Sequence, residues 1–378
     1  MKTAIIGGGP SGLYLAILLK GWGVTDDITV IEQNPKDATY GFGVGLMEGV
    51  FDQFSEADPV THEAIAAELH MMNGQDIEVP DGEVRFNYPG EAGMITRLTL
   101  LQVLQKRCDD LGVDVRYDTR LKDLSAFGDC DLIVGADGAN SVVRRSFDDV
   151  FQTKRSHLGN RFAWYGFDRA LDSALRFRRR GDDVFVAHYY PYTPDKSTFL
   201  VEVDAQTWEN GFGDLSDNER KAQSEEVFAD ILDGGTLIEN KSVWSAFETV
   251  ETVNWFTDRA AIIGDANYRA HFSIGSGTRL AKEDALALAT ALKQGGGDVP
   301  ASLAAFQAAR QPRKQKLMSA AQKSYRWYDD VRAHIDLPYL EFSYQFLGRT
   351  GRMPDDRLKL ILPDFMAAYA AFKKESAA

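Results

Sequence analysis

Three glycines near the start of the chain have the spacing of a dinucleotide-binding turn. The motif Gly7-x-Gly9-x-x-Gly12 directly follows the apolar run 3–6, and Glu32 lies twenty residues after it. The first glycine permits a tight bend, the second lets a pyrophosphate reach the backbone, and the third lets the helix pack closely. A plain glycine loop is the alternative, and the motif does not distinguish FAD from NAD. The candidate cofactor-binding residues here are Gly7, Gly9, Pro10, Ser11, Gly12 and Glu32.

Two further motifs place an acidic residue after an apolar run. Asp137 follows the run 132–136, and Asp265 follows the run 260–263 and a glycine. An acid at the end of a strand lies where α/β sheets bind ligands. The glycine-rich stretch 275–277 then opens a predicted helix, whose bare amides suit the anionic edge of a reduced flavin. Taken singly, an ordinary Asp-Gly turn or a helix-capping loop explains these motifs as well. The candidate cofactor ligands are Asp137, Asp265, Gly275, Gly277 and Thr278.

The bulk composition excludes several classes of protein. The chain has 378 residues, of which 44% are hydrophobic, and this length suits two packed lobes. Its 42 basic and 56 acidic residues give a net charge of −14, which argues against a nucleic-acid partner. The two cysteines, Cys108 and Cys130, lack metal spacing and fit a reducing compartment. We therefore expect a cytoplasmic protein without a metal, a membrane span or a signal peptide.

The elements around the motifs predict an α/β fold. The predicted strands are 3–6, 28–31, 113–117, 132–134 and 260–263, and the predicted helices include 13–22 and 98–111. The first strand, glycine turn, helix and second strand form a βαβ unit. Between residues 151 and 255 apolar and polar side chains alternate, which predicts a mostly antiparallel sheet with one exposed face. The last eighty or so residues have helical periodicity.

In this order the three motifs resemble the single-component FAD-dependent aromatic hydroxylases, the family typified by para-hydroxybenzoate hydroxylase. The resemblance spans nearly the whole chain and implies that all three motifs bind FAD, with Asp137 also helping to bind NAD(P)H. Arg97 matches the family's arginine that contacts FAD. We therefore expect a Rossmann-like FAD-binding domain, an inserted substrate domain and a C-terminal helical region. Their expected bounds are 1–60, 96–150 and 256–296 for the first, 61–95 and 151–255 for the second, and 297–378 for the third.

One stretch is similar to a narrower group within this family. Residues 270–278 resemble the CoA-thioester hydroxylases, which include salicylyl-CoA 5-hydroxylase and 2-aminobenzoyl-CoA monooxygenase. Segments 40–44, 197–202 and 342–352 agree with that group. Asn267 and Tyr268 stand where many relatives have Ala-His, and Phe272 stands where the broader family has proline. These departures leave the fold secure and the substrate open.

The resemblance also implies a reaction. NAD(P)H reduces FAD, molecular oxygen forms a flavin C4a-hydroperoxide, and an activated aromatic ring is hydroxylated, with an aryl-CoA thioester as the substrate that the narrower resemblance suggests. Because the chain has one dinucleotide fingerprint, we expect NAD(P)H to dock transiently. The alternatives are a hydroxylase of a free aromatic or indolic substrate such as tryptophan, and a flavoprotein reductase without oxygen transfer. A monomer or a homodimer is expected.

Aromatic residues and histidines supply the candidates for the substrate site. His271, four residues before Gly275, is a candidate proton shuttle, and Tyr268 could serve similarly, although each has a structural role as the alternative. The candidate substrate-binding residues are Phe42, Trp164, His188, Tyr190 and Phe272, although aromatic residues in a sheet are more often core. The arginine-rich run 176–180 is either a CoA-phosphate patch or a solvated strand end, and the second is the commoner case.

Overall fold

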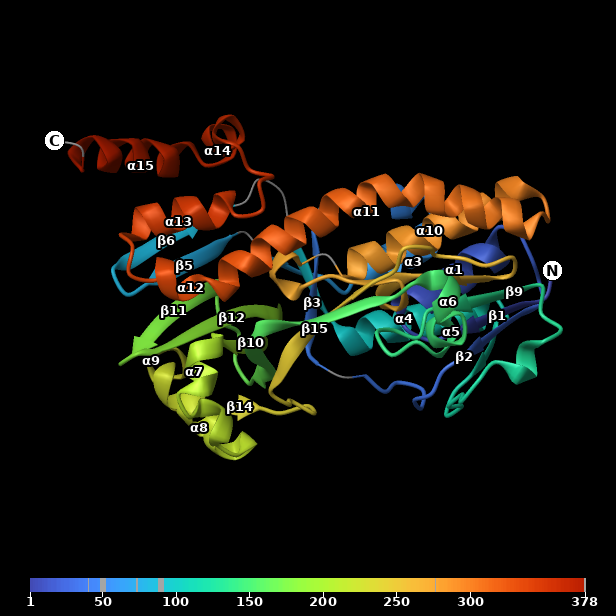
Figure 1. The fold of residues 1–378 in the computed structure, drawn as a ribbon, viewed down its shortest axis with the longest axis horizontal. Helices are drawn as coiled ribbons and strands as arrows, with labels where there is room; N and C mark the ends of the chain where they lie inside the picture. The colour runs from blue at the N-terminus through green and yellow to red at the C-terminus, as the bar shows by residue number, and fades with distance from the viewer. Residues whose placement is uncertain (40, 48–51, 73, 88–91, 276, 377–378) are drawn as a thin grey trace.

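The computed structural model describes residues 1–39, 41–47, 52–72, 74–87, 92–275 and 277–376. Two lobes built around different sheets lie side by side along the long axis (Figure 1). The lobe with the N-terminus contains a parallel sheet, and the other lobe contains a larger mixed sheet. The long helix α11 (Val299–Asp329) runs along both lobes and so connects them.

The parallel sheet has the strand order β16-β9-β1-β2-β8. Its strands are β1 (Thr3–Ile6), β2 (Ile28–Ile31), β8 (Asp114–Arg116), β9 (Leu132–Gly135) and β16 (Ala260–Ile262). Residues 3–6 pair with residues 28–31 on one side and with residues 132–135 on the other. The predicted βαβ unit and Rossmann-like sheet are therefore confirmed.

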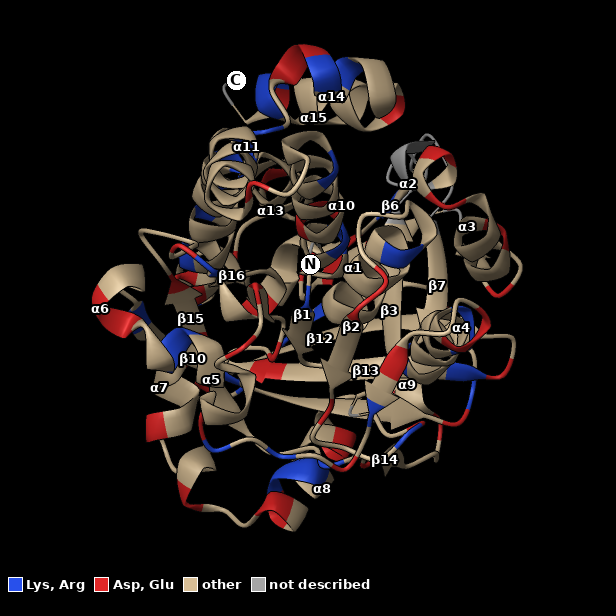
Figure 2. Cartoon of the chain, turned by 90° about the vertical axis from the view of Figure 1, so that its right-hand side faces the viewer, with Lys and Arg blue, Asp and Glu red and all other residues tan. Residues whose placement is uncertain are grey.

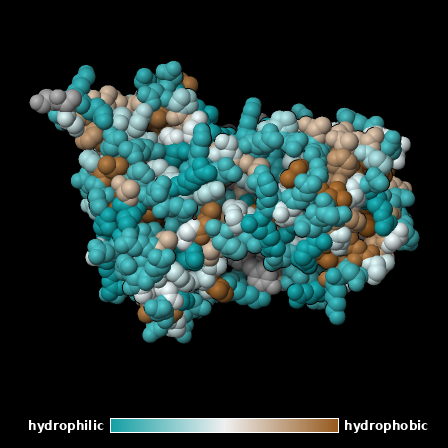
Figure 3. Space-filling view, viewed as in Figure 1, coloured by the Kyte–Doolittle hydropathy of each residue, from teal (hydrophilic) through white to brown (hydrophobic). Residues whose placement is uncertain are grey.

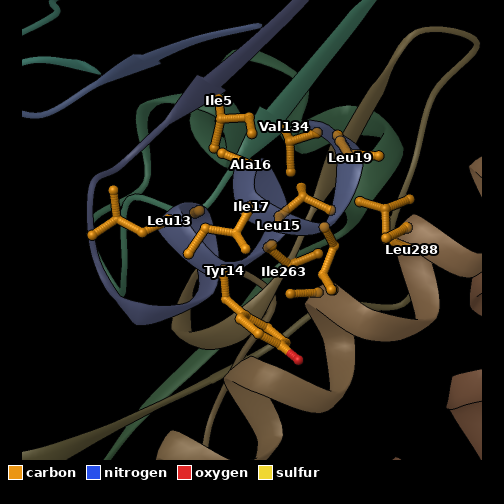
Figure 4. Close-up of a cluster of buried hydrophobic side chains, with 14 of the residues drawn as sticks. Ile5, Leu13, Tyr14, Leu15, Ala16, Ile17, Leu19, Val134, Ile263 and Leu288 are labelled. Atoms are coloured by element: carbon orange, nitrogen blue, oxygen red, sulfur yellow. The ribbon is translucent and has the colours of Figure 1, made fainter. Parts of the chain in front are cut away.

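Helices cover both faces of the parallel sheet. On one face Ile5 and Val134 pack against α1 (Pro10–Gly21), which in turn packs against α10 (Gly277–Gly295) (Figure 4). Residues 11–19 of α1 are all buried, because α1 lies between the sheet and its neighbouring helices. One of these neighbours is α4 (Arg97–Asp110). On the other face Ile6 and Ile133 pack against residues of α5 (Val142–Ser146) and α6 (Asp148–Phe151).

The large sheet has the order β17-β15-β10-β13-β12-β11-β5-β6, with β14 also paired to β10. Its strands are β5 (Gln75–Val79), β6 (Gly82–Phe86), β10 (Lys154–Phe167), β11 (Ala174–Arg180), β12 (Asp183–Thr193), β13 (Lys196–Val203), β14 (Leu237–Ile238), β15 (Ser245–Glu251) and β17 (Tyr268–Arg269). The expected antiparallel pairing is confirmed, although β11 and β5 run parallel. A smaller antiparallel sheet joins β3 (Gly43–Met47), β7 (Ala92–Thr96) and β4 (His70–Met72).

The central strands β11, β12 and β13 of the large sheet are buried on both faces, so the prediction of one exposed face is wrong there. On one face Phe185 and Phe199 pack against a helical segment that includes Phe228. On the other face Phe177 packs against the C-terminal helices. The helical elements that cover the two faces come from other parts of the chain. The alternation of residues within a strand does not show whether such elements will pack against it.

The helical C-terminal region is confirmed. After α11 come α12 (Val331–His334), α13 (Tyr339–Gly348), α14 (Asp355–Ile361) and α15 (Pro363–Glu375), which gather at one end of the molecule (Figure 1). Across the described ranges, no helix is long and apolar enough to cross a membrane. One face of the molecule is mostly hydrophilic (Figure 3), and on the side in Figure 2 both signs of charge are interspersed.

Candidate active site

A cavity of about 950 Å³ runs from the parallel sheet to the large sheet. Its first part lies beyond the carboxyl ends of β1 and β2, the edge where α/β sheets bind ligands. The volume is at the upper end of the range for ligand pockets, about 300–1,000 Å³. Among the predicted cofactor residues, those that line the cavity are Gly7, Gly9, Pro10, Ser11, Glu32, Arg97, Asp137, Asp265, Gly275, Gly277 and Thr278. Gly12 packs behind the lining.

The N-terminus of α1 meets this cavity without a side-chain cap. Gly9 is the N-cap residue, and within the described part of the chain no side chain caps the helix there. Uncapped helix amides are a ready site for an anion. Gly7 has a φ of +113°, which favours glycine, and a Cβ on Gly12 would lie 2.0 Å from the Gly7 carbonyl oxygen. The turn therefore brings bare backbone close to the space where a pyrophosphate would bind.

The carboxylate of Glu32 is fixed beside the same turn. Its Oε2 accepts a hydrogen bond from the Gly8 amide at 2.7 Å. Its Oε1 accepts from the backbone amide and the side-chain amide of Asn34, at 2.8 Å and 2.7 Å. Since a carboxylate has about four acceptor positions, one remains for a hydroxyl such as that of a ribose.

Asp137 lies in the cavity wall with half of its carboxylate unpaired. Its Oδ2 accepts a hydrogen bond from the Val142 amide at 2.6 Å, whereas Oδ1 has no partner among the residues that the structure describes. Burial raises the pKa of Asp137, although its hydrogen bonds oppose this effect. A buried acceptor without a partner calls for a donor from a ligand or from water.

Arg144 forms hydrogen bonds to both turns that carry an acidic residue, the turn of Asp137 and the turn of Asp265. This arginine is 1% exposed; it donates from Nη1 to the Ala266 carbonyl at 2.7 Å and from Nη2 to the Ala139 carbonyl. Ala139 belongs to the turn of Asp137, and Ala266 follows Asp265. The sequence pattern gave no sign of this link, because both acceptors are backbone atoms.

Charged side chains gather in the middle of the cavity. Asp265, Arg97 and Arg269 all line it. Burial raises the pKa of Asp265, although the charges of Arg269 and Arg97 oppose this effect. Burial also lowers the pKa of Arg97, and there the charge of Asp265 opposes it. The Asp265 side chain still opens on the cavity. Together with the uncapped helix and the unpaired Asp137 oxygen, these groups fit the phosphates, ribityl chain and polar ring edge of FAD.

The far end of the cavity is aromatic. Trp164, His188, Tyr190 and Phe272, all predicted substrate residues, line it. The ring centroid of Phe272 lies 6.0 Å from that of Trp164 and 5.8 Å from that of His188, and both pairs are T-shaped. Aromatic side chains arranged in this way can pack against the ring of an aromatic ligand. Sequence reasoning did not single out Arg269 in the middle of the cavity or several residues that line this end. Among those, Phe247 and Tyr328 come from distant segments without a motif, and Phe346 and Arg349 lie in the segment 342–352.

Comparison with known proteins assigns the family. Residues 1–321 match the family model described as an FAD binding domain. The chain is 36% identical over 365 residues to salicyloyl-CoA 5-hydroxylase of a Streptomyces species, which covers 93% of this chain and 70% of that protein. It is 39% identical over 294 residues to 3-hydroxy-4-methyl-anthranilyl-(aryl-carrier protein) 5-monooxygenase of Streptosporangium sibiricum, covering 77% of this chain and 79% of that protein.

The chain belongs to the FAD-dependent aromatic monooxygenases. The tetrameric form of 2-methyl-3-hydroxypyridine-5-carboxylic acid oxygenase shares the fold of this monooxygenase, with a TM-score of 0.71 and 19% identity. That likeness covers 92% of this chain and 95% of the solved one. The predicted family, the fold class and FAD as the cofactor are therefore confirmed.

Besides Gly12, three predicted residues of the monooxygenase do not line the cavity, and all three were candidates for catalysis or substrate binding. His271 is buried behind its neighbour Phe272, with ring centroids 4.1 Å apart. The ring of Tyr268 packs near the Lys314 ammonium, at 5.1 Å. Phe42 lies against the backbone of Gly166, where a Cβ would meet its ring at 2.3 Å. Their predicted roles stay predictions; Tyr40 and Ser276, in two of the similar stretches, lie outside the described residues.

The buried position of His271 predicts that the monooxygenase loses stability in mild acid. Burial lowers the pKa of His271 to about 4, against an ordinary value of 6.5. As the pH drops, the His271 imidazole is therefore protonated in the unfolded chain before it is protonated in the folded one. The free energy of unfolding should fall between pH 6.5 and pH 4 by up to roughly 3 kcal/mol. His271→Asn should remove this contribution. Urea unfolding of both proteins at several pH values checks it, and parallel stability curves would contradict it.

The arginine-rich run 176–180 already has acidic partners. Arg176 lies 2.6 Å from Glu78, and Arg180 lies 2.9 Å from Glu226. Arg178 and Arg179 pair with acidic residues as well. The structure thus favours the solvated strand end over a CoA-phosphate patch.

Proposed function

We propose that this monooxygenase hydroxylates an activated aromatic ring carried as a CoA thioester, with NAD(P)H as the reductant. The observation that carries the proposal is the pair of relatives above 30% identity, whose names place the aromatic acyl group on CoA in one case and on an aryl-carrier protein in the other. The aromatic end of the cavity supports a ring substrate. NAD(P)H would dock transiently, since the chain has one dinucleotide fingerprint.

The proposed roles follow the two ends of the cavity. The glycine turn with Glu32 would hold the ADP part of FAD, and Asp137, Asp265 and Arg97 would hold the remainder. Trp164, His188, Tyr190 and Phe272 would orient the substrate ring and keep water away from it. When bound, FAD supplies the activation of oxygen, while the chain supplies binding, orientation and exclusion of water.

A substrate screen tests the proposal. The purified protein, saturated with FAD, is given salicyloyl-CoA, 2-aminobenzoyl-CoA, the free acids, or tryptophan, and NAD(P)H consumption, hydroxylated product and peroxide are measured together. We expect product from the CoA thioesters and little from the free acids. Preferential turnover of the free acids or of tryptophan would contradict the thioester, and peroxide without product from every compound would favour a reductase.

A further inference from the structure

A histidine and a carboxylate lie paired behind the aromatic end of the cavity. Glu202 on β13 pairs with a residue of β12 that is two positions from His188, so both side chains lie on one face of the sheet. His188 Nε2 lies 3.3 Å from Glu202 Oε2, without the alignment of a hydrogen bond. The His188 side chain is 12% exposed and lines the cavity, whereas that of Glu202 is 2% exposed and does not. A ligand would therefore reach the pair through His188.

Glu202 is held in its charged form. Asn160 on β10 donates a hydrogen bond from Nδ2 to Glu202 Oε1 at 2.8 Å. Burial alone would raise the pKa of Glu202, but the contact and charge of His188, the charge of His271 and the Asn160 amide together hold it below its usual value. A buried charge is costly unless a group of opposite charge is close. His188 is the neighbour that can take up a proton and provide that charge.

The other titratable groups around the pair do not replace His188. His271, the second nearby histidine, stays neutral near pH 7 because burial lowers its pKa to about 4. The charge of Glu202 opposes this lowering of the His271 pKa, and the charges of His188, Arg269 and Arg349 add to it. Asp329 on α11 is acidic, and burial together with the charge of Glu202 raises its pKa. His188, whose Nε2 lies 3.3 Å from Glu202 Oε2, is therefore the group we consider as the proton acceptor beside this carboxylate.

We propose that His188 is a catalytic residue that accepts the proton of a ring hydroxyl or amino group of the substrate, and that Glu202 is the positioning residue that stabilises the protonated His188. The inference rests on the proposed function. In the step, the O–H or N–H bond of the substrate breaks and an N–H bond forms at Nδ1, because Nε2 faces Glu202. The electron pair stays on the substrate and makes the ring more electron-rich, and no oxidant or reductant takes part.

Four proteins test the pair: wild type, His188→Asn, Glu202→Gln and the control His157→Asn. The control removes a histidine that also lies near a glutamate, at 3.9 Å from Glu248, but whose side chain is 64% exposed. Glu202→Gln retains the shape and an acceptor for Asn160 while removing the charge. Each FAD-saturated protein is assayed with salicyloyl-CoA across pH, and its difference spectrum is recorded with 4-nitrophenol, whose phenolate absorbs in the visible.

We expect His188→Asn to lower kcat by about a hundredfold and Glu202→Gln by about tenfold, with small changes in KM. Glu202→Gln should also move the acidic limb of kcat/KM to lower pH, because a negative charge near the base has been removed. Wild type and His157→Asn should bind 4-nitrophenol as the phenolate at a lower pH than the two pair variants. A purely structural pair would not produce these shifts.

Two results would overturn the inference: the same ionisation of 4-nitrophenol in all four proteins, or pH profiles of both pair variants that coincide with the control. If the proposed function is wrong but the inference about the pair is right, the results will differ from these. Wild type would then form no product from salicyloyl-CoA, while the spectral difference between wild type and the pair variants would persist.

Discussion

A Gly9→Ala variant should fold like the wild type and bind FAD at least tenfold more weakly, a loss of about 1.4 kcal/mol. Gly9 has a φ of −77°, which alanine adopts freely, and a Cβ there would meet no protein atom within 4 Å. The new methyl group would instead extend into the cavity at the uncapped start of α1. It would obstruct the close approach of a phosphate without straining the protein.

Gly12→Ala should have a different outcome from Gly9→Ala. Its Cβ would lie 2.0 Å from the Gly7 carbonyl oxygen and 3.1 Å from the Ala136 Cβ, so α1 must move away from the sheet. We expect a loss of at least about 1–3 kcal/mol of stability together with the loss of FAD. Gly128→Ala is the control, because its φ is −63° and the nearest atom lies 3.8 Å from its Cβ. Flavin fluorescence titration and thermal unfolding measure both quantities.

The Gly9 argument fails if Gly9→Ala binds FAD as tightly as Gly128→Ala does. It also fails if Gly9→Ala unfolds at a clearly lower temperature, since the methyl group would then be straining the protein. The two glycines therefore separate cofactor binding from folding within one turn of chain.

Local motifs made it predictable which residues line the part of the cavity beside the parallel sheet. The glycine turn and Glu32 lie at the ends of adjacent parallel strands, so spacing along the chain corresponds to closeness in space. Asp137 and Asp265 follow strands of the same sheet for the same reason. Arg144 was not predictable as a link, because its acceptors are carbonyls and one of them lies 122 residues away in the sequence.

The substrate half was harder to predict, because neighbouring residues there point in different directions. His271 caps the short helix 272–274, and its Nδ1 accepts from the Ser273 amide at 3.3 Å, which directs its ring away from the cavity that Phe272 lines. Glu202 stands in an alternating strand, where a charged residue indicates solvent. The structure buries it, because α11 and other C-terminal elements cover that face.

An Arg144→Met variant should lose about 3 kcal/mol of stability and much of its FAD affinity. Hydrogen bonds to a charged group contribute roughly 1.5–3 kcal/mol each, and the buried carbonyl of Ala266 and the part-buried carbonyl of Ala139 would lose their donor. Both carbonyls belong to turns whose acidic residues line the cavity, so losing the link should loosen the cofactor wall as well. Urea unfolding with and without FAD measures both effects.

Arg259→Met is the matched control for Arg144→Met. Arg259 also donates to two backbone carbonyls, those of Gly128 and Cys130, but it is exposed, so its replacement should cost less than about 1 kcal/mol. FAD should stabilise Arg144→Met less than it stabilises the wild type or Arg259→Met, because the stability that a ligand adds to the folded state rises with the logarithm of its affinity. Equal stability losses in the two variants, or normal FAD affinity in Arg144→Met, would show that this arginine does not hold the two motifs together.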